Sequence, residues 1–155
     1  MKPEQLLNDL GLTMGLPGLA FNAEGCARLL FDGNNAVNLE SEPETGQIII
    51  YMALGPLPAQ GREALYLSLL EGNLFGTQTS GSTLAVDSLN HEVVLCRNLV
   101  ADELSAESFV KIIENFVNCA EQWRATMESA TGHAEAVCAS VPFDSASQFN
   151  GFIRG

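Results

Sequence analysis

Apolar residues at helical spacing mark both ends of the region that we expect to fold. Residues 3–14 carry a stripe of Leu6, Leu7, Leu10 and Met14, and Pro3 suits the first turn of a helix. Ser105 has the side chain of an N-cap. One face of the helix that would follow it is apolar throughout: Phe109, Ile112, Ile113, Phe116, Ala120, Trp123 and Met127. The pattern therefore predicts a helix at either end of the domain.

Short runs that favour strands lie between these helices. The runs 26–31, 36–40 and 47–54 are separated by Asp-Gly-Asn-Asn and by Glu-Pro-Glu-Thr-Gly, which predicts a meander of strands. Residues 83–86 and 92–98 flank Asp-Ser-Leu-Asn and predict a hairpin. The run 47–54 is apolar at nearly every position, so we expect core on one of its faces and a helix or a partner on the other.

A helix expected at 62–73 is apolar on more than one face. Leu65, Leu69 and Leu70 spread around more than half of the turn, and Tyr66 and Leu67 fill part of the rest. Such a helix is either fully buried within one chain or placed between its own sheet and a second subunit. The predicted order of elements is α-β-β-β-α-β-β-α, an α+β fold in a single domain of residues 1–130. Residues 131–155 are rich in small and polar residues, and we expect a flexible C-terminal tail there.

The charge balance narrows the class of partner. The chain has 7 basic and 19 acidic residues, for a net charge of −12, and such a surface repels nucleic acid and anionic lipid. The run 48–54 is too short to cross a bilayer, and residues 1–4 lead straight into the first helical pattern, without a secretory apolar region. We therefore expect a cytoplasmic protein with neither a nucleic-acid partner nor membrane insertion.

Residues that could support catalysis or metal binding are scattered. Cys26, Cys96, Cys119 and Cys138 are widely spaced and form no Cys-x-x-Cys, which favours reduced thiols. No nucleotide-binding, zinc-protease or serine-hydrolase motif is present. Asp87, His91 and Cys96 are the residue types of a thiol relay, but a cysteine inside a strand more often packs as a small apolar side chain. We expect no enzyme, no cofactor and no metal.

Five segments carry a resemblance to a known family: Leu54-Gly55-Pro56-Leu57-Pro58, the run from Leu69 to Phe75, the run from Gly81 to Asp87, Glu114-Asn115-Phe116-Val117, and Ala120-Glu121-Gln122-Trp123-Arg124. In this order they resemble the signature of type III secretion chaperones of the Tir-chaperone (CesT-like) family. The resemblance implies a twisted antiparallel sheet with three helices in a bacterial, acidic homodimer. It also implies a chaperone that binds the N-terminal segment of a secreted effector and keeps it soluble, non-globular and competent for export.

The resemblance also implies site residues. The family's dimer contact corresponds to Leu65, Leu69, Leu70, Leu74, Leu84 and Val86. Candidate effector-binding residues are Leu6, Leu10, Met14, Leu29 and Phe31. Since no ATP site is visible, release of the effector would fall to the export apparatus and its secretion ATPase. Two alternatives remain: a small α+β domain whose concave sheet holds an apolar small molecule, and a regulator that sequesters a transcription factor.

Overall fold

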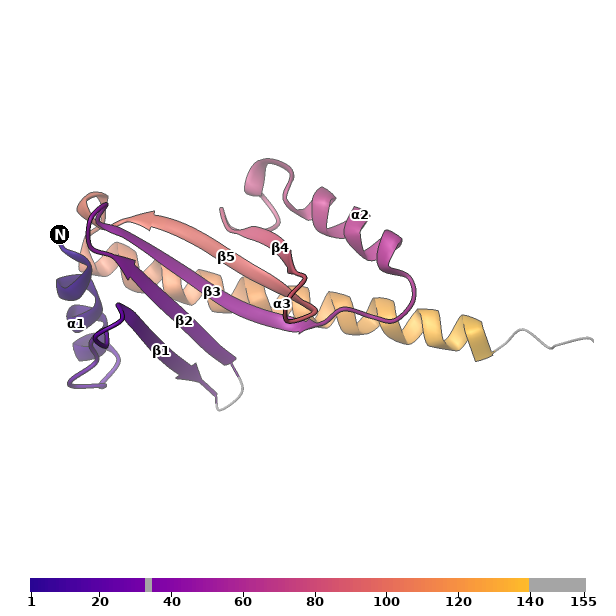
Figure 1. Ribbon diagram of the computed structural model, residues 1–155, viewed down its shortest axis with the longest axis horizontal. Coiled ribbons are helices and arrows are strands. Elements are labelled where there is room, and N and C mark those ends of the chain that lie inside the picture. Colours follow the sequence, from indigo (N-terminus) through magenta and orange to yellow (C-terminus); the bar gives the residue numbers. More distant parts are fainter. Residues whose placement is uncertain (33–34, 140–155) are drawn as a thin grey trace, which may run out of the picture.

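The computed structural model describes residues 1–32 and 35–139, with side chains described as far as residue 130. Figure 1 shows the arrangement of its helices and strands. In chain order the elements are α1 (Pro3–Thr13), β1 (Cys26–Phe31), β2 (Asn35–Glu42), β3 (Gln47–Pro56), α2 (Arg62–Gly72), β4 (Thr83–Asp87), β5 (Glu92–Val100) and α3 (Ala106–Ala139). Two short 3-10 helices, Leu74–Gly76 and Ala101–Glu103, follow α2 and β5.

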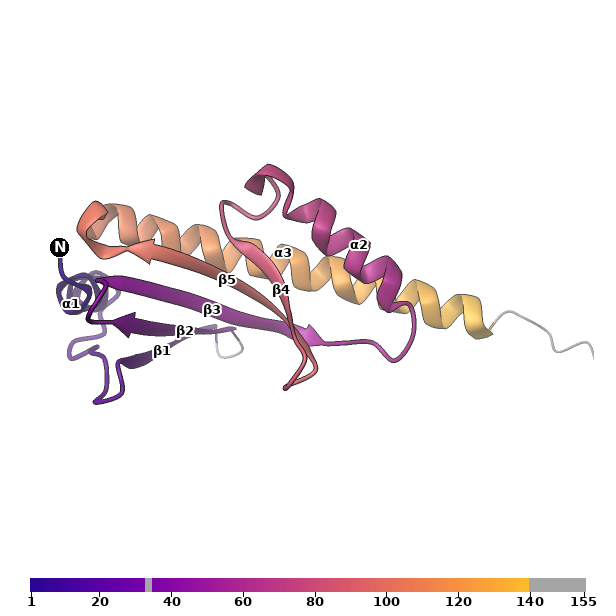
Figure 2. The same ribbon diagram turned by 45° about the horizontal axis from the view of Figure 1, so that its top comes forward.

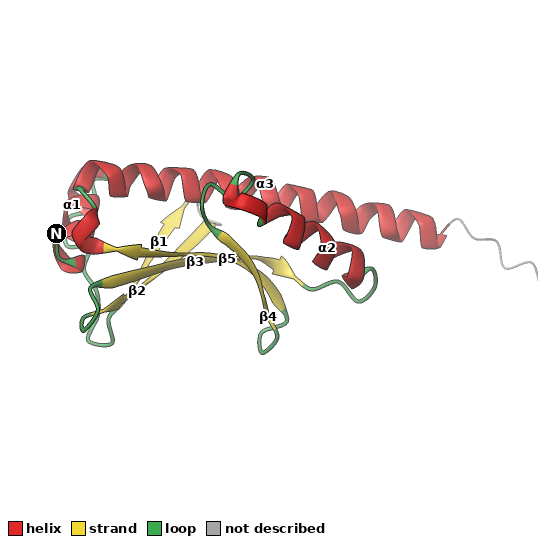
Figure 3. Cartoon of the chain, turned by 90° about the horizontal axis from the view of Figure 1, so that it is seen from above, coloured by secondary structure: helices red, strands yellow, loops and turns green. Residues whose placement is uncertain are grey.

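The strands form one antiparallel sheet in the order β1-β2-β3-β5-β4. All three α-helices lie on one side of this sheet, with α3 running along its length and α2 beside β4 (Figure 3). The predicted α+β fold and its order of elements are confirmed. The backbone of α3 is helical as far as Ala139, so the boundary expected at residue 130 falls inside a helix. Residues 140–155 of the expected tail lie outside the described residues.

The core occupies the layer between the sheet and the helices. On β3 the alternate residues Ile48, Ile50 and Met52 are fully buried and belong to one cluster with apolar residues of α1 and α3. The residues between them, such as Ile49 and Tyr51, are only half-buried. The expected core therefore covers one face of this strand. No described segment of the chain packs on the other face, so cover by a helix is not found there and cover by a partner stays a prediction.

Arg124 ties α3 to the end of β3. Its Nε donates a hydrogen bond to the carbonyl of Leu54 at 3.2 Å, and its Nη2 donates one to the carbonyl of Ala53 at 2.9 Å. Nη1 reaches Oδ1 of the buried Asn35, whose amide nitrogen donates to Glu121 at 2.7 Å. The pairing of β3 with β5 shifts register between Ala53 and Gly55, so the guanidinium satisfies carbonyls where the ladder is irregular.

Candidate protein-binding surfaces

Apolar side chains gather on the solvent side of α2 and the turn that follows it. Leu70 is 69% exposed and Phe75 is 90% exposed, and Leu67 and Leu74 are exposed as well. Phe75 has a φ of 56°, a left-handed conformation that is uncommon for a bulky residue. Figure 2 shows α2 at the margin of the molecule, with α3 and β4 beside it. We call Leu67, Leu70, Leu74 and Phe75 the α2 apolar surface.

The predicted dimer residues divide into two groups in the structure. Leu70, Leu74 and Val86 are exposed, as a contact with a second subunit requires. Leu69 and Leu84 are each only 4% exposed and belong to the chain's own core. Leu65 is partly buried at the groove between α2 and α3. Leu67 on α2 and Phe75 in the turn after it are also exposed but were not among the predicted residues, because the sequence pattern does not distinguish inward from outward positions.

The predicted effector-binding groove is not an open surface in this chain. Leu6, Leu10 and Leu29 are at most 2% exposed and lie inside the core, and Met14 and Phe31 are partly buried against it. Alternation along β1 is the physical reason: Leu29 faces the helices, so its neighbour Leu30 faces away and is 65% exposed. An accessible groove built on Leu6, Leu10 and Leu29 is therefore wrong for this structure.

Both outer edges of the sheet are partly closed by asparagine side chains. The amide of Asn73 accepts from the N–H of Leu84 at 2.8 Å and donates to its carbonyl at 3.0 Å, which closes β4 at that point. Asn22 closes β1 in a similar way at Cys26. The side chain of Asn22 accepts from the Cys26 N–H at 2.8 Å, and the main-chain N–H of Asn22 donates to the Cys26 carbonyl at 2.8 Å. Further along β1, Arg28 and Leu30 direct their main-chain groups to the same open edge, since outward-facing residues alternate in an antiparallel strand.

Two of the depressions on the described surface bear on the alternative of a smaller ligand. The groove between α2 and α3 has a volume of about 150 Å³, which is below the usual range for ligand pockets. The second is a hollow of about 620 Å³ on the sheet face away from the helices, and its lining includes Glu40, Asp87 and Glu92. Neither is an enclosed apolar cavity. The structure therefore gives no support to the alternative of a small apolar ligand in the concave sheet.

Two of the three residues considered for a thiol relay, Asp87 and Cys96, make other contacts. Asp87 accepts hydrogen bonds from the backbone of Leu89 and Asn90 and from the Asn90 side chain, and these bonds lower its pKa. Burial raises the pKa of the Cys96 thiol, and its Sγ lies 3.6 Å from the carbonyl of Thr83. In the described part of the chain, no group of histidine, cysteine and acidic residues is arranged to hold a metal ion. None of the helices described here has an apolar stretch long enough to cross a membrane.

Known proteins resemble this chain in both sequence and fold. A protein of Chlamydia pneumoniae is 33% identical over 122 residues, which are 77% of this chain and 92% of that protein. The transcriptional anti-antiactivator ExsC of Pseudomonas aeruginosa is 27% identical over 123 residues, 79% of this chain and 83% of ExsC. The structure of the ExsC–ExsE complex matches with a TM-score of 0.69 at 26% identity, covering 81% of this chain and 96% of that one.

A further solved structure shares the fold. The type III secretion chaperone SycH of Yersinia pestis, in complex with a fragment of YscM2, matches with a TM-score of 0.62 at 23% identity, covering 77% of this chain and 97% of that one. The sequence profile of the Tir chaperone protein (CesT) family matches residues 5–124. This range contains all five segments on which the resemblance was recognised. The chain therefore belongs to the Tir chaperone protein (CesT) family.

Proposed function

We propose that the chain is a homodimeric type III secretion chaperone of the bacterial cytoplasm, which holds the N-terminal segment of a secreted effector and catalyses no reaction. The observation that carries the proposal is the α2 apolar surface, because the large side chains of Leu70 and Phe75 have no cover in the chain that the structure describes. Exposed apolar patches of this kind mark sites of protein association. Membership of the CesT family supports an effector as the partner.

A second copy of the chain is the proposed cover for the α2 apolar surface. A dimer about a two-fold axis places the same patch on both subunits, so residues of α2 meet their own counterparts. Leu67, Leu70, Leu74 and Phe75 suit such a contact because they are apolar and carry no charge that would repel its copy. The groove between α2 and α3 borders the same helix, where Leu65 and Trp123 line it.

The proposed effector contact lies at the open edge of β1. Main-chain groups of Arg28 and Leu30 point away from β2, so an extended segment can pair with them as an added strand. The exposed Leu30 side chain adds apolar contact beside that strand. This surface replaces the buried residues Leu6 and Leu29 as the place to look for effector binding. The export apparatus would release the effector from this edge, and its ATPase is the proposed second partner.

Regulation is a second candidate function, and the similarity to ExsC favours it. ExsC is a transcriptional anti-antiactivator, and a structure of ExsC with ExsE matches the fold of this chain. A protein of this type would sequester a transcription factor, or a regulator of one, in place of a secreted effector.

The test is a pull-down from a native lysate followed by binding of truncated partners. A chaperone is expected to retain a secreted protein, and its N-terminal segment alone should bind. Leu30→Asp should weaken that binding while leaving the fold intact, whereas Leu29→Asp should unfold the chain because it buries a charge. Capture of a transcriptional regulator, with no secreted protein found, would favour the second function. If neither class of protein binds, the proposal is wrong.

A further inference from the structure

The sheet face opposite the helices is open and concave. Figure 3 shows the three helices on the other side and the hairpin of β4 and β5 bending away from them. Tyr51 lies near the middle of this face, paired with Asn38 on β2 and with Cys96 on β5. The hollow of about 620 Å³ spans β2, β3, β5 and β4. We call it the sheet hollow.

The lining of the sheet hollow combines apolar and acidic side chains with the polar residues Asn38, Ser88 and Asn90. Ile49, Ala53, Ala85, Val86 and Val94 line it together with the Tyr51 ring and Cys96. Its charged lining residues are Glu40, Asp87 and Glu92, and no lysine or arginine is among the lining residues described.

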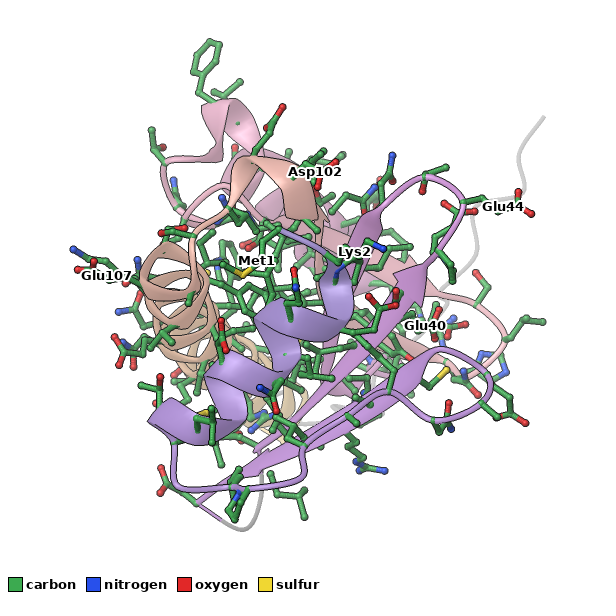
Figure 4. The ribbon with its side chains drawn as sticks, turned by 90° about the vertical axis from the view of Figure 1, so that its left-hand side faces the viewer. Met1, Lys2, Glu40, Glu44, Asp102 and Glu107 are labelled. Atoms are coloured by element: carbon green, nitrogen blue, oxygen red, sulfur yellow. The ribbon has the colours of Figure 1, made fainter. Side chains whose placement is uncertain are left out.

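Two basic side chains lie near this lining. Arg28 lines a neighbouring depression on the β1 side, and His91 lies at the tip of the hairpin beside Asp87. Figure 4 shows Glu40 on the side of the sheet away from Glu107 and the first turn of α3. The negative charge of the sheet hollow therefore belongs to the face without helices.

Hydrogen bonds fix two of these carboxylates in place. The Tyr51 hydroxyl donates to Oε1 of Glu40 at 2.8 Å, which holds that carboxylate beside the middle of the face. Asp87 is held by three hydrogen bonds from Leu89 and Asn90, and its lowered pKa keeps it ionised. Each carboxylate keeps further acceptor positions for an incoming cation. The sheet hollow therefore offers fixed negative charges beside apolar side chains.

We propose that the sheet hollow docks a segment of the exported polypeptide in which apolar side chains are flanked by lysine or arginine. That the segment belongs to an exported polypeptide rests on the proposed function. That it carries basic and apolar side chains rests on the residues that line the sheet hollow. Apolar side chains of the segment would cover Ile49 and Val94, and its basic side chains would pair with Glu40, Asp87 and Glu92. A second copy of this chain fits poorly, since its 7 basic residues are scattered along the sequence and form no segment in which they flank apolar residues.

The experiment uses the full chain and two synthetic peptides. One peptide alternates apolar residues with lysine, and the other has glutamate at each lysine position. Calorimetry should detect binding of the lysine peptide alone, and its affinity should fall as salt is raised, because the charges lie near the surface. Backbone amide signals of Tyr51 and Val94 should shift in NMR spectra, while those of α3 stay in place. Equal binding of both peptides, or shifts confined to α2, would contradict the proposal.

Variants that replace glutamate by glutamine test the role of the carboxylates, and one of them is the matched control. The double variant Glu40→Gln and Glu92→Gln keeps side-chain length and an acceptor for Tyr51 but removes two charges, and it should weaken the lysine peptide about tenfold. Glu114→Gln removes an exposed charge on α3 and should leave binding unchanged. Ala53→Lys should also weaken binding, because it places a long basic side chain among the lining residues. Unchanged affinity in the double variant would reject the docking surface. The pull-down and the Leu30 variant would still test the proposed function separately.

Discussion

Gly72 at the end of α2 lies directly against the indole ring of Trp123 on α3. A β-carbon added at Gly72 would stand 2.3 Å from one ring carbon and 2.4 Å from the next, so only glycine fits without movement. The indole Nε1 donates to the carbonyl of Gln78 at 3.0 Å, which fixes the ring in that place. Two of the segments that carry the family resemblance therefore meet at this contact. It sets how closely α2 approaches α3.

Gly72→Ala is expected to destabilise the protein by about 1–3 kcal/mol, because a methyl group must displace a packed ring. Urea denaturation followed by circular dichroism measures the change. Trp123→Phe removes the larger ring, so the double variant should lose less stability than the sum of the two single changes. Strict additivity of the two changes would show that the ring does not oppose the new methyl group.

Asn73→Ala should weaken the junction of α2 with β4. The change removes both hydrogen bonds to the main chain of Leu84, and an unsatisfied buried partner costs about 1–3 kcal/mol. Hydrogen exchange should become faster at the Leu84 amide, since its acceptor is lost. Asn98→Ala changes an exposed asparagine on β5 and is the matched control. Unchanged protection of the Leu84 amide would show that the Asn73 amide is not what closes this edge.

Hydrophobic periodicity was sufficient to predict the order of the elements and most of their bounds. Strand and helix patterns depend on local chemistry, such as the isoleucine run Ile48-Ile49-Ile50 on β3 and the N-cap Ser105. The Oγ of Ser105 accepts from the Ser108 N–H at 3.2 Å. The orientation of a side chain relative to the core depends on tertiary packing. For this reason Leu29 was expected at a surface and is buried, while Leu30 beside it is exposed.

The exposed surfaces were harder to predict than the fold, because which side chains stay exposed depends on how the helices and strands pack. On α2, Leu69 and Leu70 differ little in sequence terms, yet one is 4% exposed and the other 69%. The sheet hollow could not be recognised before the register was known. Glu40, Asp87 and Glu92 come from β2, β4 and β5, and only strand pairing brings them to one face.

The Tyr51 hydroxyl should lose its proton at a higher pH than an ordinary tyrosine does. Burial, followed by the hydrogen bond to Glu40 and the charge of that carboxylate, raises its pKa to about 12 from the ordinary value of 10.0. The folded state therefore holds this proton more tightly than the unfolded state. The stabilisation is complete below pH 10 and is lost as the pH rises through about 12.

Absorbance of the phenolate measures this titration, and Tyr51→Phe assigns the signal to Tyr51 rather than to Tyr66. Glu40→Gln should lower the Tyr51 pKa, because the negative charge that opposes the phenolate is removed. A Tyr51 pKa that does not respond to Glu40→Gln would show that burial alone accounts for the shift.

Adjacent leucines on α2 offer a sharp test of the proposed dimer. Leu70→Asp places a charge on the α2 apolar surface, so the proposed contact should be lost while each subunit stays folded. Leu69→Asp buries a charge in the chain's own core and should unfold it, at a cost of several kcal/mol.

Light scattering should give twice 16.6 kDa for the unaltered protein and 16.6 kDa for Leu70→Asp. Circular dichroism should be preserved in Leu70→Asp alone, since Leu69 and not Leu70 contributes to the core. If Leu70→Asp remains a dimer with unchanged affinity between its subunits, the second copy does not cover the α2 apolar surface, and that surface is then free to bind the effector itself.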